Sequence, residues 1–191
     1  MVTRLVDRLE QYDLKFIEEP LSPEYTHLVG DVLAHSSTPI ALGERLYSRW
    51  DYKDVFSGNS IDIIQPSVAR AGGITEVVRI ATMAEAHDMA VAPNCPMGPI
   101  AVAASTHVSS VIPNFLVQDH GFVTPNNIGA SAHGYIQNPA VFNVESGYIR
   151  PPDNPGLGLQ LNEEVIEERA SQDISTQISL SRHSDGSVAE W

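Results

Sequence analysis

The feature that most constrains the fold is a pattern that recurs along the first 120 residues. A short apolar run ends at a polar residue and is followed by a stretch with helical spacing. Five such runs occur, at residues 14–18, 40–44, 61–67, 90–94 and 115–119. Their polar ends lie 23 to 27 residues apart. A strand and helix unit of this length, repeated in series, predicts an α/β fold with a parallel sheet.

Helical spacing and capping residues predict the helices that connect these strands. They cover residues 2–11, a segment after Ser22, a segment from Ser48, a segment around 74–84, and residues 99–110. We expect Trp50 and Ile74 to face the core. Beyond residue 119, Gly, Asn, Pro and Ser become frequent, with strands expected near 141–144 and 147–150 and a helix from 162 to 169.

Composition excludes several classes of partner. The chain has 24 acidic and 11 basic residues, a formal charge of −13, which argues against nucleic acid and anionic membranes. Its one cysteine, Cys95, cannot form an internal disulfide, and no apolar run approaches the ~20 residues that span a bilayer. The first ten residues lack a signal-peptide core. We therefore expect a cytoplasmic protein with no membrane or nucleic-acid partner.

Alternating strands and helices fit either a (β/α) barrel or a doubly wound sheet, and both place chemistry at the carboxyl ends of the strands. No Gly-x-Gly-x-x-Gly motif follows the first strand, so a dinucleotide site is poorly supported. The barrel is the better interpretation. Gly72 and Gly73, after the third strand, could bind phosphate at a helix N-terminus or could simply allow a tight turn.

Two carboxylates, Glu18 and Glu44, end consecutive strands. Neighbouring strand ends of a barrel are close enough to share a hard divalent cation, and Mg²⁺ would be the natural one. The alternative is that Glu18 belongs to a hydrated strand end and that Glu44 pairs with Arg45 or Arg70. Spacing alone leaves both interpretations open.

Several motifs in register resemble one family. They are FIEEP at 16–20, GERLYSRW at 43–50, IDIIQP at 61–66, AGGITE at 71–76, APNCPMGPI at 92–100, PGLG at 155–158 and DGSVAEW at 185–191. Together they are similar to the galactonate dehydratase branch of the enolase superfamily, in the mandelate racemase/muconate lactonizing enzyme group. The resemblance covers nearly the whole chain.

This resemblance implies a Mg²⁺-dependent barrel enzyme, fronted by a capping domain, that removes water from a sugar acid to give a 2-keto-3-deoxy acid. The family's three metal carboxylates end three successive strands, and Glu18 and Glu44 match the second and third. Glu19 is the weaker candidate, because adjacent strand residues face opposite ways.

The chain departs from the family at the residues that move the proton. By resemblance, Asn94 stands where the family has its base histidine, and Ser67 where an aspartate orients that histidine. Asp119 stands where a glutamate hydrogen-bonds the developing enolate, with one methylene less of reach. An amide accepts no proton at neutral pH, and a hydroxyl supplies no charge. His87, His107, His120 and Cys95 are better explained as structural residues than as substitutes.

The resemblance also predicts how the chain is divided. We expect a partial barrel of about five of the eight strands in residues 1–121, a segment at 122–170 that packs back on the barrel or capping region, and a polar tail at 171–191. The first metal carboxylate, the acid histidine and the capping domain are expected upstream of Met1.

Two functional hypotheses follow. The first is a truncated, catalytically impaired dehydratase homologue with a weak or incomplete Mg²⁺ site. The presence of Asn94 and Ser67 where the family has its base histidine and the orienting aspartate favours this impairment. The second is a non-catalytic paralogue that binds or assembles with an intact homologue. In either case an unpaired sheet edge at residues 14–18 predicts self-association or association with that homologue.

Overall fold

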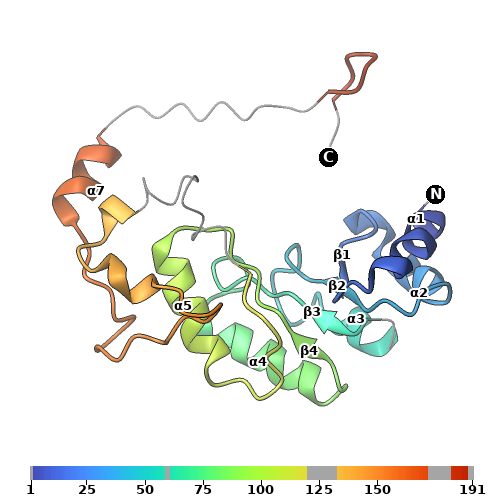
Figure 1. The fold of residues 1–191 in the computed structure, drawn as a ribbon, viewed down its shortest axis with the longest axis horizontal. Helices are drawn as coiled ribbons and strands as arrows, with labels where there is room; N and C mark the ends of the chain where they lie inside the picture. Colours follow the sequence, from blue (N-terminus) through green and yellow to red (C-terminus); the bar gives the residue numbers. More distant parts are fainter. Residues whose placement is uncertain (1, 59–60, 120–132, 172–181, 189–191) are drawn as a thin grey trace.

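Four short parallel strands form the centre of the fold. The computed structural model describes residues 2–58, 61–119, 133–171 and 182–188. The strands are β1 (Ile17–Glu18), β2 (Ile40–Leu42), β3 (Ile63–Ile64) and β4 (Ala90–Val91), in the order β1-β2-β3-β4 (Figure 1). A parallel bridge between Val91 and Phe115 adds the fifth predicted run to the edge of the sheet. The α/β class and the partial barrel are confirmed.

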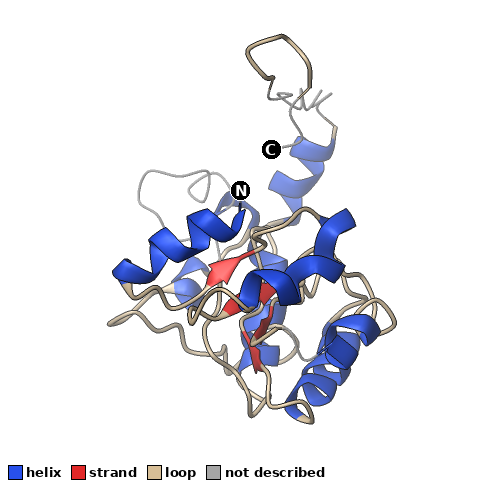
Figure 2. Ribbon diagram, turned by 90° about the vertical axis from the view of Figure 1, so that its right-hand side faces the viewer, coloured by secondary structure: helices blue, strands red, loops and turns tan. Residues whose placement is uncertain are grey.

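Helices surround these strands (Figure 2). The α-helices are α1 (Val2–Leu9), α2 (Val29–Leu33), α3 (Lys53–Gly58), α4 (Ile74–Glu85), α5 (Pro99–Ser109) and α7 (Glu163–Ala170). The 3₁₀ helices are η1 (Glu10–Tyr12), η2 (Pro23–Leu28), η3 (His133–Tyr135) and η4 (Pro139–Phe142). The spatial order of the described strands equals their sequence order. This is barrel winding, because a doubly wound sheet reverses its order at a switch point.

The two faces of the sheet carry different layers. On the outer face, Ile40, Leu42, Ile64 and Val91 are buried in one cluster with side chains of α3, α4 and α5. The opposite, inner face carries a separate cluster of small and aliphatic side chains. Its buried members are Ala41, Ile63 and Ala92, and Phe16, Ala90 and Leu116 pack against them. Period-two alternation therefore separates the helix-facing core from the barrel interior.

The segment after the sheet packs against α5. Ile136 and Phe142 are buried with Cys95, Val102 and Ala103 in a third cluster (Figure 1). Helix α7 begins where Asn162 predicted it, with the Asn162 side chain accepting a hydrogen bond from the Val165 N–H group at 3.5 Å. The C-terminal segment is thereby attached beside the end of β4.

Two strands predicted in this segment are wrong. Residues 141–144 lie in and just after η4, which begins with Pro139, a residue that suits the first turn of a helix. Residues 147–150 begin inside a tight turn instead, which Glu145 and Tyr148 close by exchanging backbone hydrogen bonds of 2.9 and 3.0 Å. Positive φ angles at Ser146 and Gly147 produce that turn.

Trp50 and Ile74 do not face the core, so that prediction is also wrong. The Asp51 carboxylate accepts hydrogen bonds from the N–H groups of Tyr47 and Ser48, both at 2.9 Å, and closes a turn. Helix α3 starts only at Lys53, which leaves Trp50 69% exposed. Ile74 is 40% exposed because it is the first residue of α4, ahead of the buried Val77.

Within the part of the chain that the structure describes, no helix is both long and apolar enough to cross a bilayer.

Gly43 joins β2 to the strand end that carries Glu44. Its φ is +141°, and a Cβ built there would lie 2.6 Å from the Tyr52 hydroxyl and 2.9 Å from the Gln65 backbone nitrogen. The buried Tyr52 hydroxyl donates to the Gly43 carbonyl at 2.9 Å. A backbone neighbour cannot swing aside as a side chain can, so only glycine fits here.

We therefore expect Gly43→Ala to destabilise the protein by more than about 2 kcal/mol, since backbone strain and overpacking add. The matched control is Gly73→Ala, where φ is also positive at +89° but a Cβ would meet nothing within 4 Å. That variant should lose only the strain, about 1–3 kcal/mol, so its loss should be smaller than that of Gly43→Ala by the overpacking cost of about 1–3 kcal/mol. Thermal or urea unfolding of both variants measures the difference, and equal losses would contradict the steric argument.

Candidate functional site

The five residues that the sequence singled out all lie at or just beyond the carboxyl ends of the strands. Glu18 is the last residue of β1 and Glu44 follows β2 by two residues. Ser67 and Asn94 each lie three residues beyond β3 and β4. Asp119 follows the bridge residue Phe115. Parallel pairing thus brings the predicted residues to the carboxyl ends of successive strands.

Glu18 lies among polar side chains of the inner face. It is exposed, and partial desolvation raises the pKa of its carboxyl group, with the negative charges of Asp119 and Glu44 adding to the rise. A hydrogen bond donated by the Gln65 side chain opposes this rise in pKa. Glu18 and Asp119 therefore feel each other's charge although they belong to opposite edges of the sheet.

Glu44 forms ion pairs with two arginines. Its carboxylate lies 3.3 Å from Arg70 Nη1 and 3.5 Å from Arg45 Nε. Arg70 Nη1 also donates to the Glu44 carbonyl at 3.1 Å. The ion pairing with Arg45 and Arg70, one of the two interpretations that the sequence left open for Glu44, is present in this structure.

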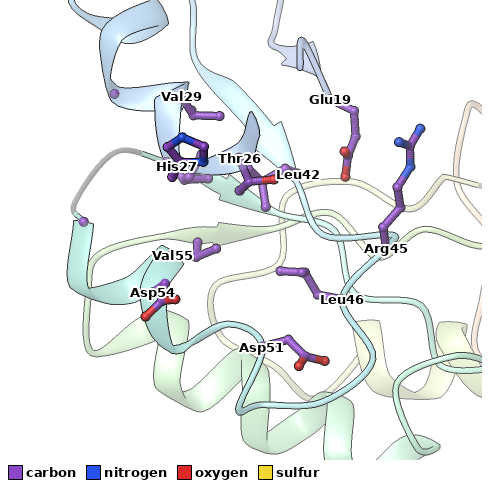
Figure 3. Close-up of a pocket in the computed structure, with 13 residues that line it drawn as sticks. Glu19, Thr26, His27, Val29, Leu42, Arg45, Leu46, Asp51, Asp54 and Val55 are labelled. Carbon is purple, nitrogen blue, oxygen red and sulfur yellow. The ribbon is translucent and has the colours of Figure 1, made fainter. Parts of the chain in front are cut away.

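Glu19 makes different contacts from Glu18. Its Oε1 accepts a hydrogen bond from the Gly43 N–H at 3.0 Å, and its φ of +44° lies in the left-handed region. Burial raises the pKa of this carboxyl, and the Arg45 charge partly opposes that. Figure 3 shows Glu19 beside a cavity of about 340 Å³, which Val29, Leu42 and Val55 of the outer core also line. Glu18 does not line this cavity.

A second cavity, of about 450 Å³, opens at the strand ends. Both Glu18 and Glu44 line it, together with Glu19, Arg45 and the chain from Pro20 to Ser22. Glu18 and Glu44, the two carboxylates predicted as metal ligands, therefore border the same cavity.

Asn94 is hydrogen-bonded to Asp119. The Asn94 Nδ2 atom donates to Asp119 Oδ2 at 3.2 Å. Asn94 is 5% exposed and Ser67 only 1% exposed, whereas Asp119 is exposed. Asn94 Oδ1 and Ser67 Oγ have no hydrogen-bond partner in the described structure. The side chains at positions 67 and 94, a hydroxyl and an amide, are therefore both uncharged.

Gln65 was missed by the sequence argument. It is 1% exposed, it contacts Glu18, and its Oε1 atom also lacks a partner among the described residues. The signal was its position two residues before Ser67 in the same run, which puts both side chains on one face of the strand.

Gln118 fixes the strand end that carries Asp119. Its Oε1 accepts hydrogen bonds from Ser105 Oγ at 2.7 Å and Ser109 Oγ at 2.9 Å, both on α5. Its Nε2 donates to the Pro93 carbonyl at 2.8 Å, and the Asp119 N–H donates to that same carbonyl at 3.2 Å. Gln118 thus faces the helices and Asp119 stands next to Asn94.

The other residues considered as nucleophiles or bases have surroundings that fit a structural role. His87 stacks on Phe56 with ring centroids 5.3 Å apart, and His107 lies within α5. His120 lies outside the described residues. Burial raises the pKa of the Cys95 thiol to about 11, so it is protonated at neutral pH and is a poor nucleophile. Gly72 and Gly73 both have positive φ angles, as the turn into α4 requires.

The described residues do not form a complete metal site. Among them, no group of three or more His, Cys, Asp or Glu side chains is placed to hold a metal ion. Glu44 is already paired with two guanidinium groups, and the Glu18 carboxylate accepts a hydrogen bond from Gln65. The donor set among these described residues therefore does not by itself fit Mg²⁺.

Known proteins match the chain along most of its length. The family model described as "Enolase C-terminal domain-like" matches residues 1–165. The D-galactonate dehydratases of Ralstonia pickettii and Ralstonia nicotianae are 46% and 44% identical to it over all 191 residues. Each match covers 50% of the relative, so the chain spans about half the length of the curated relatives it matches.

Solved structures agree. The mandelate racemase/muconate lactonizing enzyme from Jannaschia sp. CCS1 is 34% identical, with a TM-score of 0.78 over 87% of this chain and 41% of that chain. A related protein from Rubrobacter xylanophilus is 32% identical, with a TM-score of 0.77 over 87% of this chain and 41% of that chain. The parallel strands, the polar residues at their carboxyl ends and these matches together establish that the chain belongs to the enolase C-terminal domain-like family, within its galactonate dehydratase-like branch.

Proposed function

We propose that this chain is a galactonate-type sugar-acid dehydratase homologue whose own residues do not abstract the substrate proton. The observation that carries the proposal is the hydrogen bond of 3.2 Å from Asn94 to Asp119. By resemblance to the family, Asn94 occupies the position of the catalytic base. An amide that donates its N–H group to a carboxylate has no basic atom for this step.

The chemistry explains why this position matters. A proton α to a carboxylate is weakly acidic, so its removal needs a base close to it and stabilisation of the enolate charge. Enolase-superfamily enzymes generally use Mg²⁺ for that stabilisation. Ser67 supplies no charge to orient an imidazole, and Asp119 is held by Asn94 rather than by a histidine. The chain keeps the fold of the site and lacks its proton-transfer pair.

A second candidate is a non-catalytic partner of an intact homologue. The observation in its favour is that β1 pairs only with β2 in the described sheet, which leaves the other edge of β1 without a strand. Under both candidates we propose a cytoplasmic protein, with a sugar acid as the family's ligand.

The first prediction concerns turnover. The 191-residue chain, supplied with excess Mg²⁺ and a panel of sugar acids, should form no 2-keto acid above background, because each lost acid or base group removes about 10²–10⁴-fold of rate. Asn94→His combined with Ser67→Asp should restore nothing, since no residue of the chain matches the family's first metal carboxylate.

The controls for this assay are Glu18→Gln and Glu44→Gln, which keep size and remove charge. Turnover by the unmodified chain that disappears in either variant would sink the proposal and reveal a base other than Asn94.

The second prediction concerns the metal. We expect the chain to bind Mg²⁺ with a Kd of about a millimolar or weaker, because two carboxylates and water do not replace three converging carboxylates. Replacing Arg70 by Gln should tighten binding, since the guanidinium 3.3 Å from Glu44 competes with the cation. Glu44→Gln should abolish it.

Titration calorimetry measures all three proteins, with Glu145→Gln as a control because this exposed carboxylate lies far along the chain from the site. Micromolar binding that Glu44→Gln abolishes would show a site better formed than we propose.

The third prediction concerns assembly. The open edge of β1 should make the chain self-associate, so size-exclusion chromatography with light scattering should give a mass above 20.8 kDa. Leu14→Lys, at a residue 37% exposed just before β1, should shift the distribution toward monomer. Val111→Lys replaces an apolar residue 68% exposed beyond α5 and should change nothing. A monomeric wild-type chain would rule out edge-driven assembly.

A further inference from the structure

Helix α5 has an apolar side that the described residues do not cover. Its sequence is apolar on most sides, and a helix of that kind is normally buried all round. Ala104 and Val108 pack into the outer core, and Val102 and Ala103 pack against the segment after the sheet. Ile100 belongs to neither cluster and is 50% exposed. One side of α5 is therefore left open to solvent.

This open side lines a groove of about 690 Å³, a volume in the range of small-molecule sites. The other lining residues come from α7, from Tyr135 and from the two residues that follow Ser67 after β3. Helices α5 and α7 lie on the same side of the fold, away from α1 (Figure 1). Small residues make up much of the lining, at Ala69, Gly98, Ala101, Ala104 and Ala170. Such a lining leaves a smooth trough that suits a slender chain.

Arg169 is the one charged side chain among the described residues that line the groove. It is exposed, and it forms no ion pair with any residue that the structure describes. Its neighbours three and four positions earlier on α7 are Ile166 and Val165, and the glutamates of α7 project about 100° or more around the helix from it. Its own helix therefore offers Arg169 no carboxylate partner.

The charge and the lining select the ligand. Apolar walls disfavour a sugar acid or free phosphate, whose many polar groups would lose water without gaining hydrogen bonds. A cationic ligand would be repelled by Arg169, whereas a carboxylate would be attracted to it. The groove therefore calls for an apolar body with a single anionic end.

We propose that the groove between α5 and α7 binds a medium-chain alkanoate. Its carboxylate pairs with Arg169, and its methylene chain lies against Ile100 and Ile166. The groove shares no lining residue with the cavities beside Glu18 and Glu19, so this site is independent of the proposed dehydratase chemistry.

The test is a titration of the 191-residue chain with octanoate, kept below its micelle-forming concentration and followed by calorimetry and by isoleucine methyl signals in ¹H–¹³C NMR spectra. We expect saturable binding at one site that shifts the methyl signals of Ile100 and Ile166. Hexanoate should bind about four- to fifteenfold weaker, since each fully buried methylene contributes about fourfold. Octylammonium, with the same chain and opposite charge, should bind at least about tenfold weaker.

Two variants assign the ends of the ligand. Arg169→Gln should weaken octanoate about three- to tenfold, the value of one exposed charge pair, and leave 1-octanol unchanged. Ile100→Ser should weaken both ligands. The matched controls are Arg150→Gln and Val111→Ser, at an exposed arginine and an exposed valine that do not line the groove, and neither should change binding.

Stability and mass show whether the groove is free in the unliganded protein. Arg169→Gln should leave the Tm level, because its side chain is exposed. Ile100→Ser should lower the Tm by no more than about 4 °C, as expected for a half-exposed side chain. A larger fall, or a lower mass by light scattering, would show that another part of the chain or a second copy already covers the groove, and this would overturn the inference.

Three results of the titration would also overturn it: no saturable octanoate binding, octylammonium binding as tightly as octanoate, or methyl shifts that spare both Ile100 and Ile166. Formation of a 2-keto acid is assayed separately and bears only on the proposed function.

Discussion

Parallel pairing between β1 and β2 decides which of the two adjacent carboxylates, Glu18 or Glu19, faces the barrel interior. The Ile17 N–H donates to the Pro39 carbonyl and the Glu19 N–H to the Ala41 carbonyl, both at 2.9 Å. A slip of one residue would turn Glu19 to the inner face and Glu18 to the outer one, because side chains alternate along a strand. The backbone hydrogen bonds between β1 and β2 thus decide that Glu18 lies in the barrel interior and that Glu19 bonds to Gly43.

The apolar layer below the site affects the ionisation of the carboxyl groups above it. Ala41, Ile63 and Ala92 are almost completely buried on the inner face, directly beneath the polar strand ends. Polar groups above such a layer are partly withdrawn from water, which is why desolvation is the largest cause of the raised pKa of Glu18. Close approach at Gly43, where a Cβ would meet Gln65 at 2.9 Å, keeps the same strand ends tightly spaced.

The strands and helices with a regular spacing of apolar residues could be predicted from the sequence. The contacts between side chains could not. Strand ends followed from short apolar runs, and the helix after Asn162 from its cap. Gln65 escaped notice because an uncharged residue in an apolar run does not stand out by its type, and only its spacing from Ser67 indicated that it faces the site. The pairing of Glu44 with Arg70 joins residues 26 apart, so sequence could offer it only as an alternative to a metal. Residues 141–144 were misassigned because Pro139 decides the local backbone.

Asn94 and Ser67, which by resemblance stand where the family has a histidine and an aspartate, make physical sense as a pair. Ser67 is 1% exposed, so an aspartate alone at this position would be a buried charge without a cation to balance it. A histidine alone at position 94 would meet the Asp119 carboxylate and lack the partner that fixes its tautomer. An amide and a hydroxyl at these positions are both neutral, so neither buries a charge without a counter-ion. The site is therefore compatible with a folded core without a histidine at position 94 and an aspartate at position 67.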